Sequence, residues 1–147
     1  MKKTLITAAC FAGLLSLTAF SAKADINKKV LQAFNSVFAK ATNVRWTEYK
    51  DHYFVSFNHN DVLVKANYDM NGNMINSIRY YKEQRLPLNV LCKIKKTYPS
   101  KTIDNVTEVN EDSKTNYFIQ LKDDKSWTII RSDENGELSV VDKFNKA

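Results

Sequence analysis

The chain has 147 residues, of which 26% are charged, 12% are aromatic and only three are glycine, and its formal net charge is +6. A chain of this length can bury an apolar core and is long enough for one or two small domains. Three of the six excess positive charges are lysines within the first 24 residues, and the later lysines are interleaved with acids. This distribution does not indicate a surface that binds nucleic acid.

Residues 1–24 have the three parts of a secretion signal. Two lysines follow the initial Met, residues 5–20 are apolar, and the last three residues, AKA, form a small-x-small cleavage motif. The apolar stretch is shorter than the roughly 20 residues that span a bilayer. We therefore expect cleavage after Ala24 and a periplasmic or secreted mature chain, residues 25–147, without a membrane span. An uncleaved N-terminal anchor is the alternative.

Cys92 is the single cysteine of the expected mature chain. The fold therefore has to rest on an apolar core and not on an internal disulfide. Because Cys92 falls within the apolar rhythm of an expected helix, we predict a buried and unreactive thiol.

The first expected element is a helix over residues 26–41, with Asp25 as its N-cap. Apolar residues recur at helical spacing on one face, and lysines occupy the other. The apolar face consists of Ile26, Val30, Phe34, Val37, Phe38 and Ala41. Four segments rich in Tyr, Phe, Val and Trp follow, and they predict half-buried antiparallel strands: NVRWTEY, YFVSF, VLVKANY and MINSIRYY.

A second helix is predicted over residues 86–98, with Pro87 at its first position and Pro99 just after its end. Four more predicted strands follow: NVTEV, YFIQL, SWTIIRS and LSVVDKF. The fold class is therefore α+β, as a tandem repeat of two modules, each a helix followed by a four-stranded antiparallel sheet. The expected modules are residues 25–84 and 85–147.

The word Asp-x-Asn-Gly occurs twice, at residues 69–72 and again 64 positions later at residues 133–136. At the same offset Tyr53-Phe54 coincides with Tyr117-Phe118, which supports an internal repeat. The word lies between the third and fourth expected strands of each module, where Asp can bond the backbone and Gly tolerates positive φ. A calcium loop is disfavoured because the first copy lacks the later carboxylate ligands. We predict tight turns.

These motifs in this order resemble the PepSY-like family of periplasmic proteins, which is also described as resembling the β-lactamase inhibitor protein. The resemblance covers the expected mature chain. It rests on Phe38, Val44 and Trp46; Tyr53-x-Val55; Tyr68-Asp69-x-Asn71-Gly72; the pattern LP..V…I…YP over 86–99; and Asp133-x-Asn135-Gly136. It implies antiparallel sheets with helices on one side and the other face available, and it implies no reaction. The family's members are mostly exported bacterial proteins of unknown function, and in the inhibitor the exposed sheet surface grips an enzyme.

No sequence motif supplies a catalytic nucleophile, a phosphate loop or a zinc site, so we expect no enzyme, no cofactor and no metal. Glu48 and Glu108 lie at equivalent repeat positions, and each is expected to pair with a Lys or Arg across strands. His52 and His59 are expected to be solvated turn residues. A weak surface metal site that includes neighbouring aspartates is the alternative.

Strand alternation predicts a helix-free sheet face that carries aromatic and basic side chains, a composition typical of protein-recognition surfaces. The candidate binding residues are Arg45, Tyr49, Phe54, Lys65, Arg79, Tyr81, Phe118, Lys122 and Trp127. The alternation of the strand containing Trp127 is ambiguous, so this side chain belongs either to the core or to the face. The aromatics could instead pack between the modules or against a second copy of the chain, as in a dimer.

We therefore expect a non-catalytic exported protein that binds an unidentified envelope or secreted protein through its sheet faces, with enzyme inhibition as one form of such binding. The alternative is a periplasmic carrier of a small apolar or aromatic ligand between the two modules.

Overall fold

The computed structural model describes residues 25–146, so the expected signal peptide lies outside the described residues. The elements in chain order are α1 (Lys28–Phe38), β1 (Thr42–Glu48), β2 (His52–His59), β3 (Val62–Asp69), β4 (Met74–Tyr81), the 3₁₀ turn η1 (Glu83–Arg85), α2 (Leu88–Thr97), β5 (Thr102–Glu111), β6 (Lys114–Lys122), β7 (Ser126–Asp133) and β8 (Leu138–Asn145). The predicted α+β class and antiparallel strands are confirmed.

The eight strands form one continuous antiparallel sheet in the order β1 to β8. Strands β4 and β5 join the two halves of the chain, with Asn76 opposite Glu111 and Tyr81 opposite Val106. Separate sheets in each half would leave two more rows of unpaired N–H and C=O groups, which this pairing satisfies. The prediction of one sheet per module is therefore wrong.

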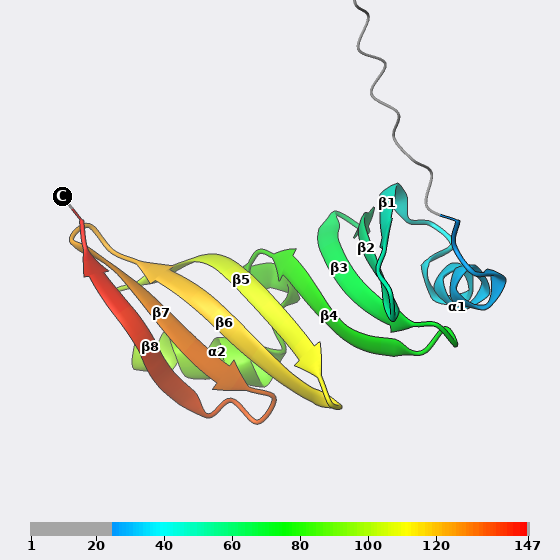
Figure 1. Ribbon diagram of the computed structural model, residues 1–147. Helices are drawn as coiled ribbons and strands as arrows, with labels where there is room; N and C mark the ends of the chain where they lie inside the picture. The colour runs from blue at the N-terminus through cyan, green and yellow to red at the C-terminus, as the bar shows by residue number, and fades with distance from the viewer. Residues whose placement is uncertain (1–24, 147) are drawn as a thin grey trace, which may run out of the picture.

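Both helices lie on the same side of this sheet. Figure 1 shows α1 outside β1–β3 and α2 behind β6–β8, while the strands turn between the two halves. Since the helix-covered side is on the outside of the bend, the helix-free face is on the inside. We call this helix-free surface the concave face.

Helix α1 packs on the first half of the sheet through Val30 and Phe34, which are buried. The Phe34 ring lies edge-on to Phe57, with 4.9 Å between ring centroids, and also to Trp46, at 5.2 Å. Such edge-to-face contacts add to the stabilisation that burial of the rings provides. Val37 was predicted on the same face, but it is 63% exposed, and the last residue of α1, Phe38, packs on Phe57 in its place.

The N-cap of α1 is Asn27 and not Asp25. The Asn27 side chain accepts a hydrogen bond from the Lys29 backbone N–H at 2.8 Å, which satisfies one free donor of the first turn. Pro87 was predicted at the first helical position of α2, but it is the N-cap, and the helix begins one residue later than predicted, at Leu88.

Helix α2 buries Val90 and Ile94 against the second half, whereas Cys92 is exposed. The prediction of a buried thiol is wrong. Two positions along an α-helix correspond to a rotation of roughly 200°, so a residue midway between two buried ones at i and i+4 points away from the core.

Both Asp-x-Asn-Gly words form the predicted turns. The Asp69 carboxylate accepts hydrogen bonds from the backbone N–H groups of Asn71 and Asn73, at 2.8 and 2.9 Å, and Asp133 binds those of Asn135 and Glu137, at 3.0 and 2.8 Å. The Asn73 side chain also donates to Asp69, and with the backbone bonds it lowers the pKa of this carboxyl group; the pKa of Asp133 is lowered chiefly by the backbone bond from Glu137. Gly72 and Gly136 have φ of 90° and 82°.

Each turn is tied to the start of a helix. The Asn27 side chain donates to the Met70 carbonyl at 3.0 Å, and the Asn89 side chain donates to the Glu134 carbonyl at the same distance. These bonds fix the β3–β4 turn under α1 and the β7–β8 turn under α2.

Candidate functional site

The prediction that Arg79 and Tyr81 lie on the helix-free face is wrong, because every second residue of β4 from Ser77 onward points to the helix-covered side. The β3–β4 register shifts between Asn67 and Tyr68, so that Ser77 pairs with Ala66 on the helix-covered side. Without this bulge, the pairing of Tyr68 with Met74 would continue and place Ser77 opposite Lys65, on the concave face. One extra residue in a strand reverses the faces of all that follow.

Arg79 and Tyr81 instead bind Glu108 on the helix-covered side of the sheet. Arg79 Nη1 lies 2.9 Å from Glu108 Oε1, and the Tyr81 hydroxyl donates to Glu108 Oε2. Burial, together with the hydrogen bond and the negative charge of Glu108, raises the pKa of Tyr81. Burial, with the nearby Glu108 charge, also raises the pKa of Tyr117. The predicted cross-strand ion pair is therefore confirmed for Glu108, while Glu48 is exposed.

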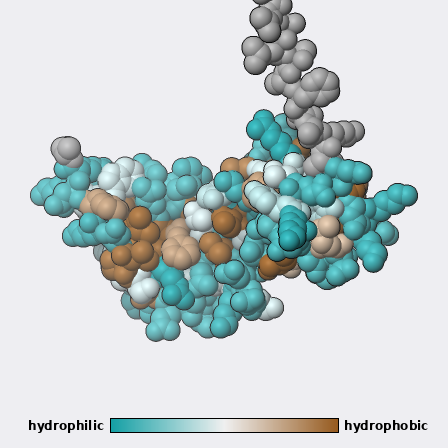
Figure 2. Space-filling view, viewed as in Figure 1, coloured by the Kyte–Doolittle hydropathy of each residue, from teal (hydrophilic) through white to brown (hydrophobic). Residues whose placement is uncertain are grey.

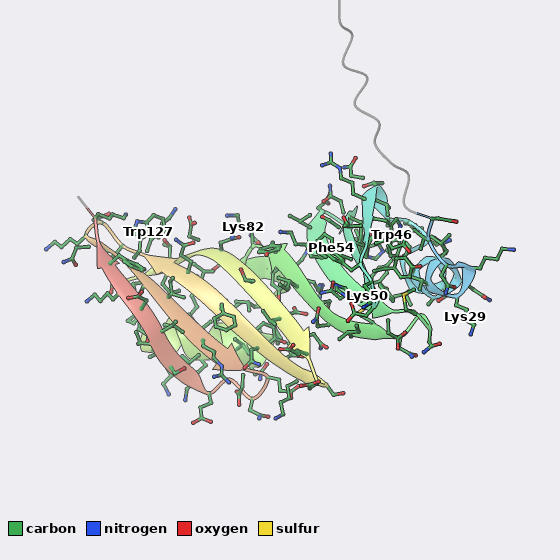
Figure 3. All side chains as sticks on the ribbon, viewed as in Figure 1. Lys29, Trp46, Lys50, Phe54, Lys82 and Trp127 are labelled. Atoms are coloured by element: carbon green, nitrogen blue, oxygen red, sulfur yellow. The ribbon has the colours of Figure 1, made fainter. Side chains whose placement is uncertain are left out.

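The concave face is built from the alternate residues of the strands that point away from the helices. Cross-strand pairs define it, including Thr47 with Phe54, Lys65 with Ile78, Thr107 with Phe118 and Trp127 with Phe144. Figure 2 shows apolar side chains gathered over the second half and bordered by hydrophilic ones. In Figure 3, Phe54 lies on the side of the first half turned toward β5–β8, whereas Trp46 lies toward α1.

Trp127 belongs to the concave face. Its neighbours Ser126 and Thr128 are buried on the helix side, which places the indole on the opposite side. Two lysines lie over the indole ring, Lys122 at 5.6 Å and Lys146 at 5.0 Å from its centroid. In the first half, Lys65 lies 5.4 Å from the centre of the Tyr80 ring. Contacts of this kind between a cation and an aromatic ring are favourable and hold flexible lysines over flat rings.

Six of the nine predicted binding residues lie on the concave face: Arg45, Phe54, Lys65, Phe118, Lys122 and Trp127. Tyr49 lies at its rim, half exposed, and its ring stacks on His52 with 4.5 Å between centroids. The sequence reasoning missed Ile78, Tyr80 and Phe144. The β4 residues were missed because nothing in the β3–β4 connection revealed the bulge.

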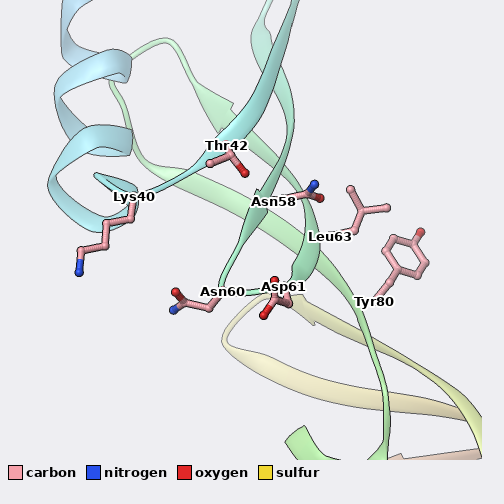
Figure 4. Close-up of a pocket in the computed structure, with 7 residues that line it drawn as sticks. All are labelled: Lys40, Thr42, Asn58, Asn60, Asp61, Leu63 and Tyr80. Carbon is pink, nitrogen blue, oxygen red and sulfur yellow. The ribbon is translucent and has the colours of Figure 1, made fainter.

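A shallow cavity of about 520 Å³ extends this surface at the β2–β3 turn. Figure 4 shows Leu63 and Tyr80 on one side of it and Lys40 on the other. The lining is mostly polar, so this depression adds hydrogen-bonding groups to the apolar part of the face.

The two histidines have separate surroundings. His52 lies 2.8 Å from Asp51, a contact that lowers the pKa of this carboxyl group, while the His59 ring packs edge-on to Phe38. Within residues 25–146, no three His, Cys, Asp or Glu side chains are grouped closely enough to hold a metal ion. In the same part of the chain, no helix is long and apolar enough to cross a membrane.

Solved structures show the same fold. A BLIP-like protein from Bacteroides fragilis has a TM-score of 0.58 and 15% sequence identity, with 81% of this chain and 85% of that chain covered. A DUF2874 family protein from Bacteroides uniformis has a TM-score of 0.57 and 17% identity, over 81% and 88% of the two chains. A protein from Bacteroides eggerthii that is named as periplasmic has the same four values.

The chain has a BLIP-like fold. No protein-family model matches the chain, and no curated protein sequence does either. At identities below 20% the likeness concerns architecture alone. It agrees with the resemblance to the β-lactamase inhibitor protein, whereas membership of the PepSY-like group stays a prediction.

Proposed function

We propose that this chain is a non-catalytic exported protein that binds another protein of the cell envelope or its surroundings through the concave face. The observation that carries the proposal is the partly exposed aromatic and apolar surface that continues from Phe54 in the first half to Trp127 and Phe144 in the second. Contiguous apolar surface of this kind, bordered by polar groups, marks interaction sites in soluble proteins. Aromatic residues on a rigid sheet also lose little conformational freedom on binding.

The charges of the concave face indicate the kind of partner. Its cations are Arg45, Lys65, Lys114, Lys122, Arg131 and Lys146, whereas the strand register places the acids Asp69, Glu111, Asp133 and Asp142 on the same side. Lys122 is paired with Asp104 at 2.5 Å, and Asp69 and Asp133 accept hydrogen bonds from the backbone of their own turns, so the charges that remain beside the aromatic rings are those of Lys65 and Lys146. A partner surface that combines apolar side chains with carboxylates would complement it.

Two further points support the proposal. A BLIP-like protein is among the structures with this fold, and a relative in fold is named as periplasmic. Both agree with an exported binding protein, and enzyme inhibition is the form of binding that we would test first. The expected signal peptide supplies the route of export.

We also propose that the two halves, residues 25–84 and 85–147, are copies of one helix-plus-four-strand unit. The equivalent bonds from Asn27 to Met70 and from Asn89 to Glu134 support this interpretation. The matching carboxylate-bonded turns at Asp69 and Asp133 give further support.

Affinity capture from an extract of the cell's own envelope tests the proposed function. The bait is the tagged chain from Asp25 onward, beside a variant with Phe54→Ser, Phe118→Ser and Trp127→Ser. A matched control carries Val37→Ser, Met70→Ser and Leu88→Ser, which remove exposed apolar side chains from α1, the β3–β4 turn and α2. We expect a protein that is retained by the wild type and the control and lost with the first variant. Equal retention by all three folded forms would contradict the proposal.

A further inference from the structure

A second concavity lies on the opposite, helix-covered side of the sheet, where α1 ends beside β4. Its volume is about 310 Å³. The side chains that matter for its chemistry are Phe38, Val62, Val64, Met74, Arg79 and Arg85. We call it the helix-side cleft. It thus combines apolar walls from α1, β3 and β4 with two guanidinium groups.

The two arginines are held in different ways. Arg79 donates to the Glu108 carboxylate at 2.9 Å, so its charge is largely neutralised. Arg85 Nη2 donates to the Asn60 backbone carbonyl, which orients the guanidinium without neutralising it. The nearby Glu83 is engaged elsewhere, since its carboxylate lies 2.7 Å from Lys95 Nζ. Among residues 25–146, no carboxylate forms an ion pair with Arg85.

The apolar walls differ in exposure. Val62 and Val64 are buried at the base of the cleft, whereas Met74 is 42% exposed. Phe38 is partly buried and packs edge-on to His59, another residue of the lining. The cleft therefore has a fixed apolar floor from β3 and a flexible thioether side chain near the surface, which can adapt to the shape of a ligand.

We propose that the helix-side cleft binds a small organic carboxylate with an aromatic or branched apolar tail. The planar guanidinium of Arg85 presents paired N–H donors that match the two oxygens of a carboxylate, and its positive charge attracts an anion. None of the lining residues in the described part of the chain carries a carboxylate that would repel an anion. The volume holds roughly ten water-sized groups, the size of a small aromatic acid.

This site is separate from the proposed protein-binding surface. The concave face and the helix-side cleft lie on opposite sides of the sheet, and they share none of the residues used in the tests. Loss of binding at one of them therefore leaves the other measurable, and the two proposals can fail independently.

Isothermal titration calorimetry on the chain from Asp25 onward tests the proposal with three probes. Phenylacetate has both ring and charge, phenylacetamide has the ring without the charge, and acetate has the charge without the ring. We expect phenylacetate to bind about tenfold or more tightly than either of the others, because only phenylacetate uses Arg85 and the apolar walls together. Equal binding of the acid and the amide, or no binding of phenylacetate up to about 10 mM, would overturn the proposal.

Substitutions in the helix-side cleft test whether phenylacetate binds there. Arg85→Gln should weaken phenylacetate about tenfold and leave phenylacetamide unchanged, because the substitution removes only the charged donor. Met74→Glu, which places a carboxylate in the cleft at a partly exposed position, should weaken phenylacetate as well. Lys28→Gln is the matched control, since it removes one positive charge at the opposite end of α1. Unchanged phenylacetate affinity in a folded Arg85→Gln variant would place the ligand elsewhere and contradict the assignment.

Discussion

At the scale of single residues, Tyr68 shows how burial sets the behaviour of a side chain. It is 2% exposed, and within residues 25–146 its hydroxyl oxygen has no hydrogen-bond partner. Burial raises the pKa of Tyr68 to about 12, because the phenolate would be poorly solvated. A buried hydroxyl without a partner also costs free energy relative to a solvated one.

Tyr68→Phe should therefore raise the free energy of unfolding by about 1 kcal/mol at neutral pH. The pH dependence has a definite sign. Since the unfolded chain titrates near pH 10 and the folded chain near 12, the folded state binds more protons in that window, and stability falls as the pH rises through it. The phenylalanine variant should show a smaller fall in urea denaturation between pH 9 and about 11.

Tyr98→Phe provides the control for this experiment, because it removes the same atom from a partly buried ring at the end of α2. An equal change in both variants, or a destabilised Tyr68→Phe, would mean that the Tyr68 hydroxyl has a favourable interaction in the folded protein.

At the scale of elements, the two glycine turns make similar backbone shapes with different neighbours. A Cβ atom on Gly72 would lie 2.9 Å from the Lys29 carbonyl oxygen, a backbone atom of α1. A Cβ atom on Gly136 would have no neighbour nearer than the Asn89 carbonyl oxygen at 3.8 Å. Both residues have positive φ, so both substitutions introduce backbone strain, but only Gly72 also has a steric conflict.

Gly136→Ala should lower the free energy of unfolding by about 1–2 kcal/mol, through backbone strain alone. Gly72→Ala should lower it further, because α1 has to move away from the β3–β4 turn. Chemical denaturation of both variants under one set of conditions provides the comparison. Equal losses of unfolding free energy in the two variants would show that the close contact between the β3–β4 turn and α1 does not affect stability.

The helices and strands could be predicted from the sequence because their hydrophobic periods are local. Val30, Phe34, Val90 and Ile94 follow the helical spacing and are all buried. The faces of β4 could not be predicted in the same way. A bulge beside Tyr68 depends on how the β3–β4 turn rests on α1, which is a tertiary contact with no pattern of its own in the sequence.

The exposure of Cys92 could have been foreseen from helical geometry, because Cys92 lies about 200° from Val90. The exposure of Val37 could not, because Val37 lies about 20° from Val30 and 60° from Phe34, on the same side of α1 as both buried residues. By contrast, the pairing of β4 with β5 determines whether the chain forms one sheet or two, and this pairing is a tertiary contact that no local pattern specifies. The sequence around Arg79 and Glu108 is compatible with one continuous sheet and with two separate sheets. The pairing of Glu108 with a cation was predicted, but the sequence did not show that this cation comes from the other half of the chain.

At the scale of the whole molecule, the continuous sheet makes one surface from two halves. Strand pairing between β4 and β5 places Tyr80 beside Thr107, so aromatic residues of the first half continue into those of the second. A stable protein interface buries roughly 800 Å² on each partner, which a single four-stranded sheet would barely provide. The bend in Figure 1 turns the helix-free surfaces of both halves toward the same space.

The measurement that tests this account most directly is a lysine-labelling footprint read by mass spectrometry. The tagged chain would be acetylated both as purified protein and in its own envelope extract. We predict that Lys65, Lys122 and Lys146, which lie beside aromatic rings of the concave face, become less reactive in the extract. Lys28 and Lys93, exposed on the two helices, should keep their reactivity. Protection of the helix lysines with unchanged labelling of the concave-face lysines would contradict the central claim.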